Sequence, residues 1–297
     1  MPQPTDRAAR PVRANPPGLL PGTRWRETLR DVLGSVHREV RLSLTPLVRP
    51  ERWAFIVGCY NSGTELLVRL LETHPGIAAL PEEGQFLTDQ LPADYELGLP
   101  RMWALREDLF RLTEEDGGPD VVRLKREWLM RLDRSRTTFL EKSPPNAART
   151  RWLQHHFENA HFIAIVRNGY AVAEGIRRKA EPFHLKGGWP IELCARQWSR
   201  SYEVLLEDAP HLRHLLWIRY EDLTAEPEAE LRRILAFLGL PAAPTVARDR
   251  ALVVHEKNEP IRDMNDESLR RLSAAERRTI TAEAEPMLRR FGYDIRS

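Results

Sequence analysis

Cysteine is scarce in this sequence, because Cys59 and Cys194 are the only two among 297 residues. Two cysteines imply neither a disulfide framework nor a cysteine-based zinc site. We expect both to be buried thiols in a reducing cytoplasm. Long apolar runs are also missing, since no stretch approaches the roughly 20 residues of a transmembrane helix. The net charge of only +2 provides no global basic field, so a nucleic-acid partner is not expected.

The length and composition predict one large α/β domain preceded by two short segments. Residues 1–22 are rich in proline and arginine and lack the apolar core of a secretory signal, so we expect a disordered tail. Residues 23–50 include an amphipathic stretch at 24–47, for which we expect a peripheral helix. The alternative is a helix that contacts a membrane surface or a partner. Residues 51–297 then form the main domain.

Alternating strand and helix patterns in the main domain predict a mainly parallel sheet covered on both faces, a three-layer arrangement. The runs expected to form buried strands lie at 54–57, 77–80, 138–142, 161–167 and 215–220. Thr224 is expected to cap one helix, and Ser273 with Glu276 forms a capping box for the last helix. Pro144 and Pro145 are expected to hold an extended segment after the third strand.

A glycine-bounded turn follows the first apolar run. Gly58 and Gly63 enclose it, Ser62 lies beside the second glycine, and leucines at helical spacing come next. In such a strand, turn and helix, backbone N–H groups and the helix N-terminus bind phosphate. The alternative is an ordinary strand-to-helix connection. A Walker A loop has lysine where Thr64 stands, so its absence disfavours a P-loop kinase.

Charged side chains occur where three of the expected strands end. Glu82 and Glu83 follow the second strand, Lys142 ends the third, and Arg167 ends the fourth. Ligands of α/β sheets bind beyond the carboxyl ends of the strands. The carboxylates therefore suit a general base, and the alternative is a solvated acidic turn. The alternative for Lys142 is a surface lysine paired with Glu141.

The turn resembles the phosphosulfate-binding loop of sulfotransferases that use 3′-phosphoadenosine 5′-phosphosulfate (PAPS). That loop typically reads Arg or Lys, Ser, Gly, Thr, Thr, and this chain has Asn61, Ser62, Gly63, Thr64 and Glu65. The first and last of these positions depart from the pattern. The order of the motifs from about residue 53 to 293 is most similar to the tyrosylprotein sulfotransferases and to bacterial proteins like them. The resemblance implies a P-loop-type fold.

Further family motifs have counterparts later in the chain. Arg167 matches the family arginine on the 3′-phosphate, but Gly175 stands where the serine of that clamp is expected. Lys179 matches a basic residue of the tyrosylprotein branch, and Tyr220 matches a tyrosine near the adenine. The Lys-x-Pro motif matches at Lys142, which the resemblance makes an active-site lysine. The family's catalytic carboxylate matches Glu83, with Glu82 as the register alternative.

The resemblance implies in-line transfer of a sulfuryl group from PAPS to a hydroxyl or amine, without a metal. The acceptor can be a small molecule, a carbohydrate or a peptide, because residues 84–130 contain no motif that distinguishes these classes. Since Asn61 supplies no cation, Lys142 is expected to stabilise the transferring group, with Lys257 and Arg262 as the other choices. The alternative functions are a catalytically impaired relative that binds PAPS or its product PAP, and a small-molecule kinase.

Overall fold

The computed structural model describes residues 34, 36–180, 186–242, 252–254, 257–259 and 261–296. The chain divides into two units, Met1–Leu44 and Thr45–Ser297. In the first unit, residues 36–44 are helical, within the stretch where a helix was expected. The expected tail at 1–22 lies outside the described residues.

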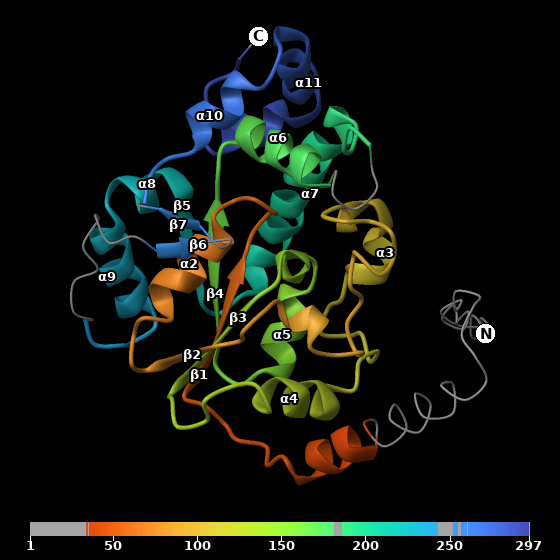
Figure 1. Ribbon diagram of the computed structural model, residues 1–297, viewed down its shortest axis with the longest axis vertical. Helices are drawn as coiled ribbons and strands as arrows, with labels where there is room; N and C mark the ends of the chain where they lie inside the picture. The colour runs from red at the N-terminus through yellow and green to blue at the C-terminus, as the bar shows by residue number, and fades with distance from the viewer. Residues whose placement is uncertain are drawn as a thin grey trace, which may run out of the picture. The chain divides into compact units, whose positions relative to one another are not determined.

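A five-stranded sheet forms the centre of the second unit (Figure 1). Its strand order is β2-β3-β1-β4-β5, and every pairing in it is parallel. The strands are β1 (Arg52–Val57), β2 (Ile77–Ala79), β3 (Thr138–Lys142), β4 (Ala160–Val166) and β5 (Leu215–Arg219). The prediction of an α/β domain with a mainly parallel sheet is therefore confirmed. A separate antiparallel pair joins β6 (Leu252–Val254) to β7 (Lys257–Glu259).

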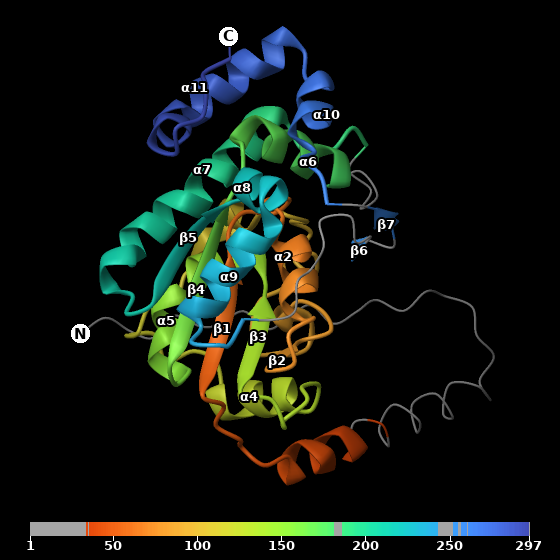
Figure 2. The same cartoon turned by 90° about the vertical axis from the view of Figure 1, so that its left-hand side faces the viewer.

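Helices cover both faces of the sheet (Figures 1 and 2). One face packs against α2 (Thr64–Leu71), α8 (Tyr220–Ala225) and α9 (Pro227–Phe237). The other packs against α4 (Val121–Leu129), α5 (Thr150–His156), α6 (Gly169–Ala180), α7 (Ile191–Asp208) and α11 (Ala274–Arg290). Two shorter helices are α3 (Glu107–Phe110) and α10 (Asn265–Arg270). Single 3₁₀ turns occur at η1 (Gly84–Phe86), η2 (Trp103–Arg106), η3 (Pro144–Ala148) and η5 (Ala209–His211).

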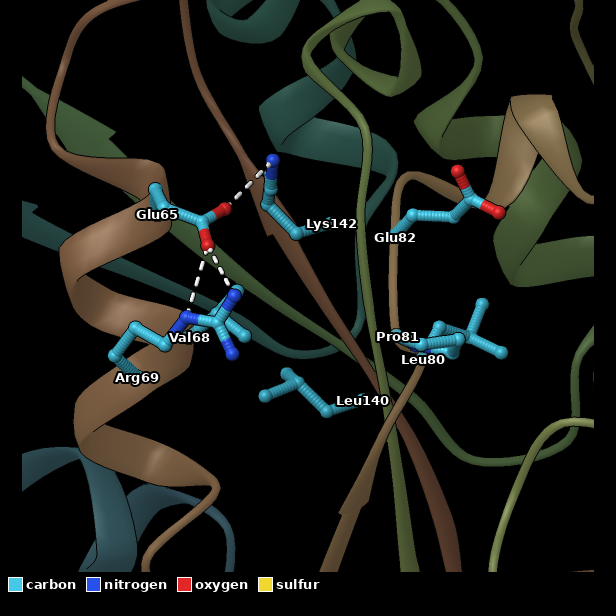
Figure 3. Close-up of a pocket in the computed structure, with 8 residues that line it drawn as sticks. All are labelled: Glu65, Val68, Arg69, Leu80, Pro81, Glu82, Leu140 and Lys142. Carbon is cyan, nitrogen blue, oxygen red and sulfur yellow. Dashed lines mark hydrogen bonds and ion pairs between the residues drawn. The ribbon is translucent and has the colours of Figure 1, made fainter. Parts of the chain in front are cut away.

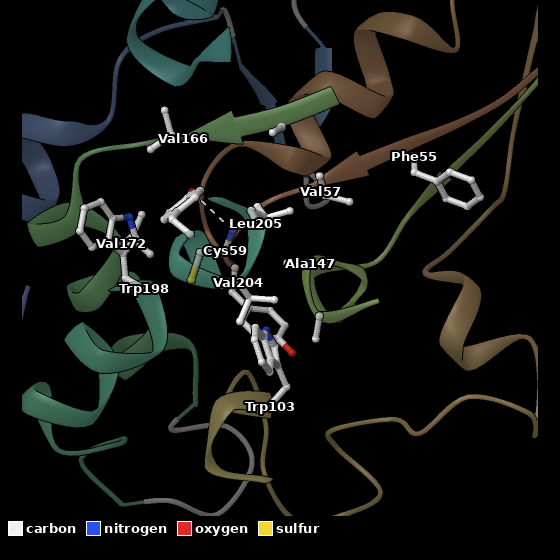
Figure 4. Packing of buried hydrophobic residues seen from close by; sticks show 14 of the residues in the cluster. Phe55, Val57, Cys59, Trp103, Ala147, Val166, Val172, Trp198, Val204 and Leu205 are labelled. Atoms are coloured by element: carbon white, nitrogen blue, oxygen red, sulfur yellow. Dashed lines mark hydrogen bonds between the residues drawn. The ribbon is translucent and has the colours of Figure 1, made fainter. Parts of the chain in front are cut away.

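The sequence of β1 explains why two cores form. Trp53, Phe55 and Val57 belong to one apolar cluster, whereas Ala54 and Ile56 belong to the other. Successive side chains of a strand point to opposite faces, so a continuous apolar run buries both faces of a parallel strand. Figure 4 shows part of the first cluster, where the segment after β1 packs against α7. The strand that leads into the glycine turn is thereby fixed on both sides.

Two local predictions about helix starts have different outcomes. Thr224 lies inside α8, where its hydroxyl donates to the Glu221 carbonyl at 3.0 Å. The next helix begins instead at Pro227, whose fixed φ and missing N–H suit the first turn of a helix. The prediction of a Thr224 cap is therefore wrong. The capping box of Ser273 and Glu276 is confirmed at the start of α11.

The segment after β3 also differs from the prediction. Ser143 is extended, with φ −138° and ψ 120°, as a residue before proline prefers. Pro144 and Pro145 do not continue this extension but begin η3, because their fixed φ also suits a first helical turn. Cys59 and Cys194 are both free and buried, as expected. No helix in the described part of the chain combines the length and apolar character needed to cross a bilayer.

Candidate functional site

The expected site residues gather at one edge of the sheet. In the strand order, β1 lies between β3 and β4, and the chain leaves β1 toward one side of the sheet and reaches β4 on the other. Such a switch point leaves a crevice beyond the carboxyl ends of the strands, where α/β proteins bind ligands. The turn after β1, Lys142 at the end of β3 and Arg167 after β4 therefore meet there.

Both glycines of the turn are needed for its backbone. Gly58 has φ +153°, and a Cβ atom there would lie 2.5 Å from the carbonyl oxygen of Ile165. Gly63 has φ +93°, and a Cβ atom there would lie 2.5 Å from the ring of Tyr220. A side chain at either position would clash as well as strain the backbone. The turn therefore packs closely between β4 and the start of α8.

Hydrogen bonds beneath the turn hold its shape. The Ser62 side chain is fully buried and lies 3.0 Å from the hydroxyl of Tyr202. That hydroxyl donates to the Ile165 carbonyl at 2.9 Å, so Ser62 is tied to the neighbouring strand. Thr64 is also buried and forms the first residue of α2. The structure thus gives Ser62 a role in support of the turn.

Arg167 lies against the turn from the side of β4. Its Nη1 donates to the carbonyl of Asn61 at 2.9 Å, and its Nε donates to Oδ1 of Asn265 at 2.8 Å. The guanidinium lies 4.2 Å from the ring centre of Tyr220, a cation–π contact. Its Nη2 is buried and has no hydrogen-bond partner among the described residues. Asn265, in α10, was not predicted as a site residue, because the polar sequence around it shows no apolar repeat at helical spacing.

The Lys142 ammonium lies between two carboxylates. Its Nζ is 3.0 Å from Oε1 of Glu83 and 3.3 Å from Oε2 of Glu65. Burial lowers the pKa of Lys142, but the two carboxylates outweigh burial and raise it above its usual value. The other oxygen of Glu65 accepts from Nε of Arg69 at 3.0 Å. Figure 3 shows Glu65 between the two cations in a small pocket, with Glu82 on the pocket's opposite wall.

A buried network fixes the direction of Glu83. Its Oε2 accepts from Nε2 of Gln85 at 2.9 Å, and the same amide lies 3.3 Å from Oδ1 of Asp94. The Tyr60 hydroxyl donates to Oδ2 of Asp94 at 2.9 Å. Burial raises the pKa of Asp94 to about 6. Glu82, in contrast, is exposed. Neither Gln85 nor Asp94 was predicted, because both lie in the segment without a readable pattern.

Gly175 and Lys179 approach the turn from α6. A Cβ atom on Gly175 would lie 3.2 Å from the side chain of Asn61. Lys179 follows one turn later, where burial, together with Arg101 and Arg178, lowers its pKa to about 7. Gly175 therefore faces the turn, and Lys179 lies on the same helix close to the cations of the site.

Of the two other expected cations, only Arg262 has a side chain in the described part of the structure. Lys257 lies in β7, whose side chains are outside the described part of the structure. The Arg262 side chain is half exposed, with Nη2 3.8 Å from Glu267. Its carbonyl accepts a hydrogen bond from Tyr220 at 3.2 Å. Arg262 is thus near the site through its backbone.

Known proteins resemble this chain over most of its length. Residues 54–244 match the protein family described as the sulfotransferase family. Protein-tyrosine sulfotransferase A of Caenorhabditis elegans is 24% identical over 83% of this chain and 68% of its own length. Protein-tyrosine sulfotransferase 1 of Danio rerio is 26% identical over 91% of this chain and 82% of its own length.

Solved structures share the fold. A sulfotransferase of Mycobacterium avium superimposes with a TM-score of 0.52, at 15% identity over 90% of this chain and 82% of that one. The sulfotransferase domain of the Synechococcus PCC 7002 olefin synthase gives 0.50, at 23% identity over 84% and 98%.

Proposed function

The chain belongs to the sulfotransferase family and is a PAPS-dependent enzyme; we propose that it moves the sulfuryl group to an acceptor hydroxyl, with Glu83 as the general base. The observation that carries the proposal is the meeting of Glu83 and Lys142, 3.0 Å apart, beside the glycine turn. A carboxylate and a cation at the same point suit a reaction that removes a proton and stabilises negative charge.

The nucleotide is proposed to bind along the turn. Backbone N–H groups of residues 58–64 and the start of α2 would receive the 5′-phosphosulfate, because a turn and a helix N-terminus attract anions. Arg167, with a buried and unbonded Nη2, would receive the 3′-phosphate. Tyr220, stacked on Arg167, matches the family tyrosine near the adenine, and we expect it to contact that ring.

In the proposed reaction, Glu83 takes the proton of the acceptor hydroxyl. The acceptor oxygen then bonds to sulfur while the bond between sulfur and the bridging oxygen of the 5′-phosphate breaks, leaving PAP. Lys142 stabilises the charge that develops on the transferring group, as cations do in phosphoryl transfer. Glu65 would repel that group, but its contacts with Lys142 and Arg69 compensate its charge.

The acceptor is proposed to be a phenolic hydroxyl first, because two relatives are named protein-tyrosine sulfotransferases. Carbohydrate or small-molecule hydroxyls and amines are the next classes to test. A cytoplasmic location stays a prediction that rests on the two free, buried thiols. Contact of the 24–47 helix with a membrane or a partner also stays a prediction.

Two measurements test the proposal. Titration with PAP and with ATP separates a sulfotransferase from a kinase, because only the former should prefer PAP. Transfer of labelled sulfate from PAPS to tyrosine peptides, phenols, sugars and amines then tests catalysis. PAP binding without transfer to any acceptor would indicate the impaired relative, and preference for ATP would contradict the family function.

A further inference from the structure

The glycine turn lacks a cation of its own, because Asn61 stands where the family pattern has Arg or Lys. The structure brings a guanidinium to that point from a distant segment. Nη1 of Arg101 lies 3.5 Å from Oδ1 of Asn61, at hydrogen-bond distance. We propose that Arg101 supplies the positive charge on the 5′-phosphosulfate that Asn61 does not. This inference rests on the proposed function.

The backbone at Arg101 is held in an uncommon conformation. Its φ is +65°, in the left-handed region that residues other than glycine rarely adopt. The Arg101 N–H donates to Oδ2 of Asp94 at 2.7 Å, which fixes this conformation. Strain of this kind persists where surrounding contacts impose it, and it clusters at functional sites. The same Asp94 contacts Gln85, so one buried carboxylate helps to position both Arg101 and the general base.

The residues on either side of Arg101 are anchored in the core. The Pro100 carbonyl accepts from Nε1 of Trp189 at 2.9 Å, and the Ala104 N–H donates to Oε1 of Gln197 at 2.9 Å. Trp103 is fully buried, in the cluster shown in Figure 4. Arg101 is therefore carried on a fixed segment, which is what a residue that orients a substrate requires.

The guanidinium of Arg101 has no carboxylate partner among the described residues. Its contacts there are the Asn61 amide and the ring of Tyr60, whose centre is 6.0 Å away, and its Nε is buried without a hydrogen-bond partner. Lys142, in contrast, is already paired with two carboxylates. An uncompensated cation beside a phosphate-binding turn is suited to an anionic ligand.

Lys179 lies close enough to Arg101 for the charge of Arg101 to affect its pKa, which supports the same conclusion. Burial lowers the pKa of Lys179 most, and the charge of Arg101 lowers it more than any other charge does. Arg178, Arg167 and Lys142 act on Lys179 in the same direction. These positive charges disfavour the charged form of Lys179, and an anion bound beside them would offset that repulsion.

Binding measurements with two nucleotides test the proposal. PAP carries a 5′-phosphate, whereas adenosine 3′-phosphate does not, so a contact to the 5′-phosphate affects only the first. Arg101→Gln removes the charge and leaves a shorter, polar side chain. It should weaken PAP by about 10- to 150-fold, the range for a charge-assisted hydrogen bond, and leave adenosine 3′-phosphate unchanged. Arg101→Lys keeps the charge and should lose less.

Arg106 provides a matched control in the same segment, because it is half exposed and pairs with Asp108. Arg106→Gln should bind both nucleotides as the unaltered protein does. Equal losses for both nucleotides in Arg101→Gln, or an unchanged affinity for PAP, would overturn the role of Arg101 and leave the proposed function intact. Failure of the unaltered protein to bind PAP would instead overturn the proposed function and this inference with it.

Discussion

Replacement of the proposed general base gives the sharpest test of the site. Glu83→Gln keeps the shape of the side chain but removes the group that accepts the proton. The expected fall in turnover is about 100- to 10,000-fold, the usual contribution of a general base. In free energy of activation this corresponds to about 3 to 5.5 kcal/mol. PAP affinity should change by no more than about threefold, because Glu83 faces Lys142 and Gln85 rather than the turn.

The structure also limits the effect of Glu83→Gln on stability. Lys142 would lose its partner at 3.0 Å but keep Glu65 at 3.3 Å, so it would not become an unpaired buried charge. We therefore expect the free energy of unfolding to fall by about 1 to 3 kcal/mol, the range for one lost charged hydrogen bond. Thermal unfolding beside PAP titration checks that the variant is folded and still binds.

The neighbouring carboxylate supplies the control. Glu82 is exposed, and Glu82→Gln should leave the turnover of labelled-sulfate transfer within about twofold of the unaltered enzyme. A full loss in Glu82→Gln with normal turnover in Glu83→Gln would show that the register is shifted by one residue. Normal turnover in both would refute the argument that a carboxylate at this position removes the acceptor proton.

Three further predictions follow from the cations of the site. Arg167→Ala should weaken PAP by about 10- to 150-fold but spare adenosine 5′-phosphosulfate, which lacks the 3′-phosphate; equal losses by titration calorimetry would contradict the assignment. Lys142→Ala should lower turnover at least about 100-fold, as removal of one oxyanion donor does, with little loss of PAP binding; normal turnover would exclude this role. Since burial and nearby cations lower the pKa of Lys179 to about 7, its charge is lost as the pH rises through that value. PAP affinity should therefore fall as the pH rises through about 7, and Lys179→Met should flatten the profile; an identical slope in that variant would exclude Lys179 as the source.

The sheet could be predicted because its signals are local. Apart from Arg52 and His161, β1 and β4 are apolar throughout and bury both of their faces, which distinguishes a central parallel strand from a solvent-facing one. The boundaries were less predictable where proline was involved. Proline suits both an extended segment and the first turn of a helix. The residues around Pro144 and Pro227 do not distinguish the two conformations, and in the structure each proline begins a helix or helical turn.

The part of the candidate site that local patterns predicted consists of the glycine turn and the residues at strand ends. Glu83, Lys142 and Arg167 each end or follow a buried run, and parallel strands bring such ends to one edge. Arg101 and Asp94 were not predictable, because they reach the site from an irregular segment that neither strand nor helix period describes. Their contacts with Asn61 and Gln85 are tertiary, and no spacing along the chain encodes them.

The departures from the family pattern are linked to one another in space. Asn61 adopts a left-handed backbone with φ +59°, which asparagine tolerates better than most residues, and this conformation directs its carbonyl to Arg167. Gly175 faces the Asn61 side chain so closely that the Cβ atom of a serine there would lie 3.2 Å from it. Asparagine at one position and glycine at the other therefore fit as a pair, and Arg101 approaches the same side chain. The third departure, Glu65, is matched by Lys142 and Arg69. Since each departure has a local partner, the missing loop cation does not by itself argue for an inactive enzyme. Whether Arg101 contacts the 5′-phosphate is the observation that separates an active enzyme from an impaired relative.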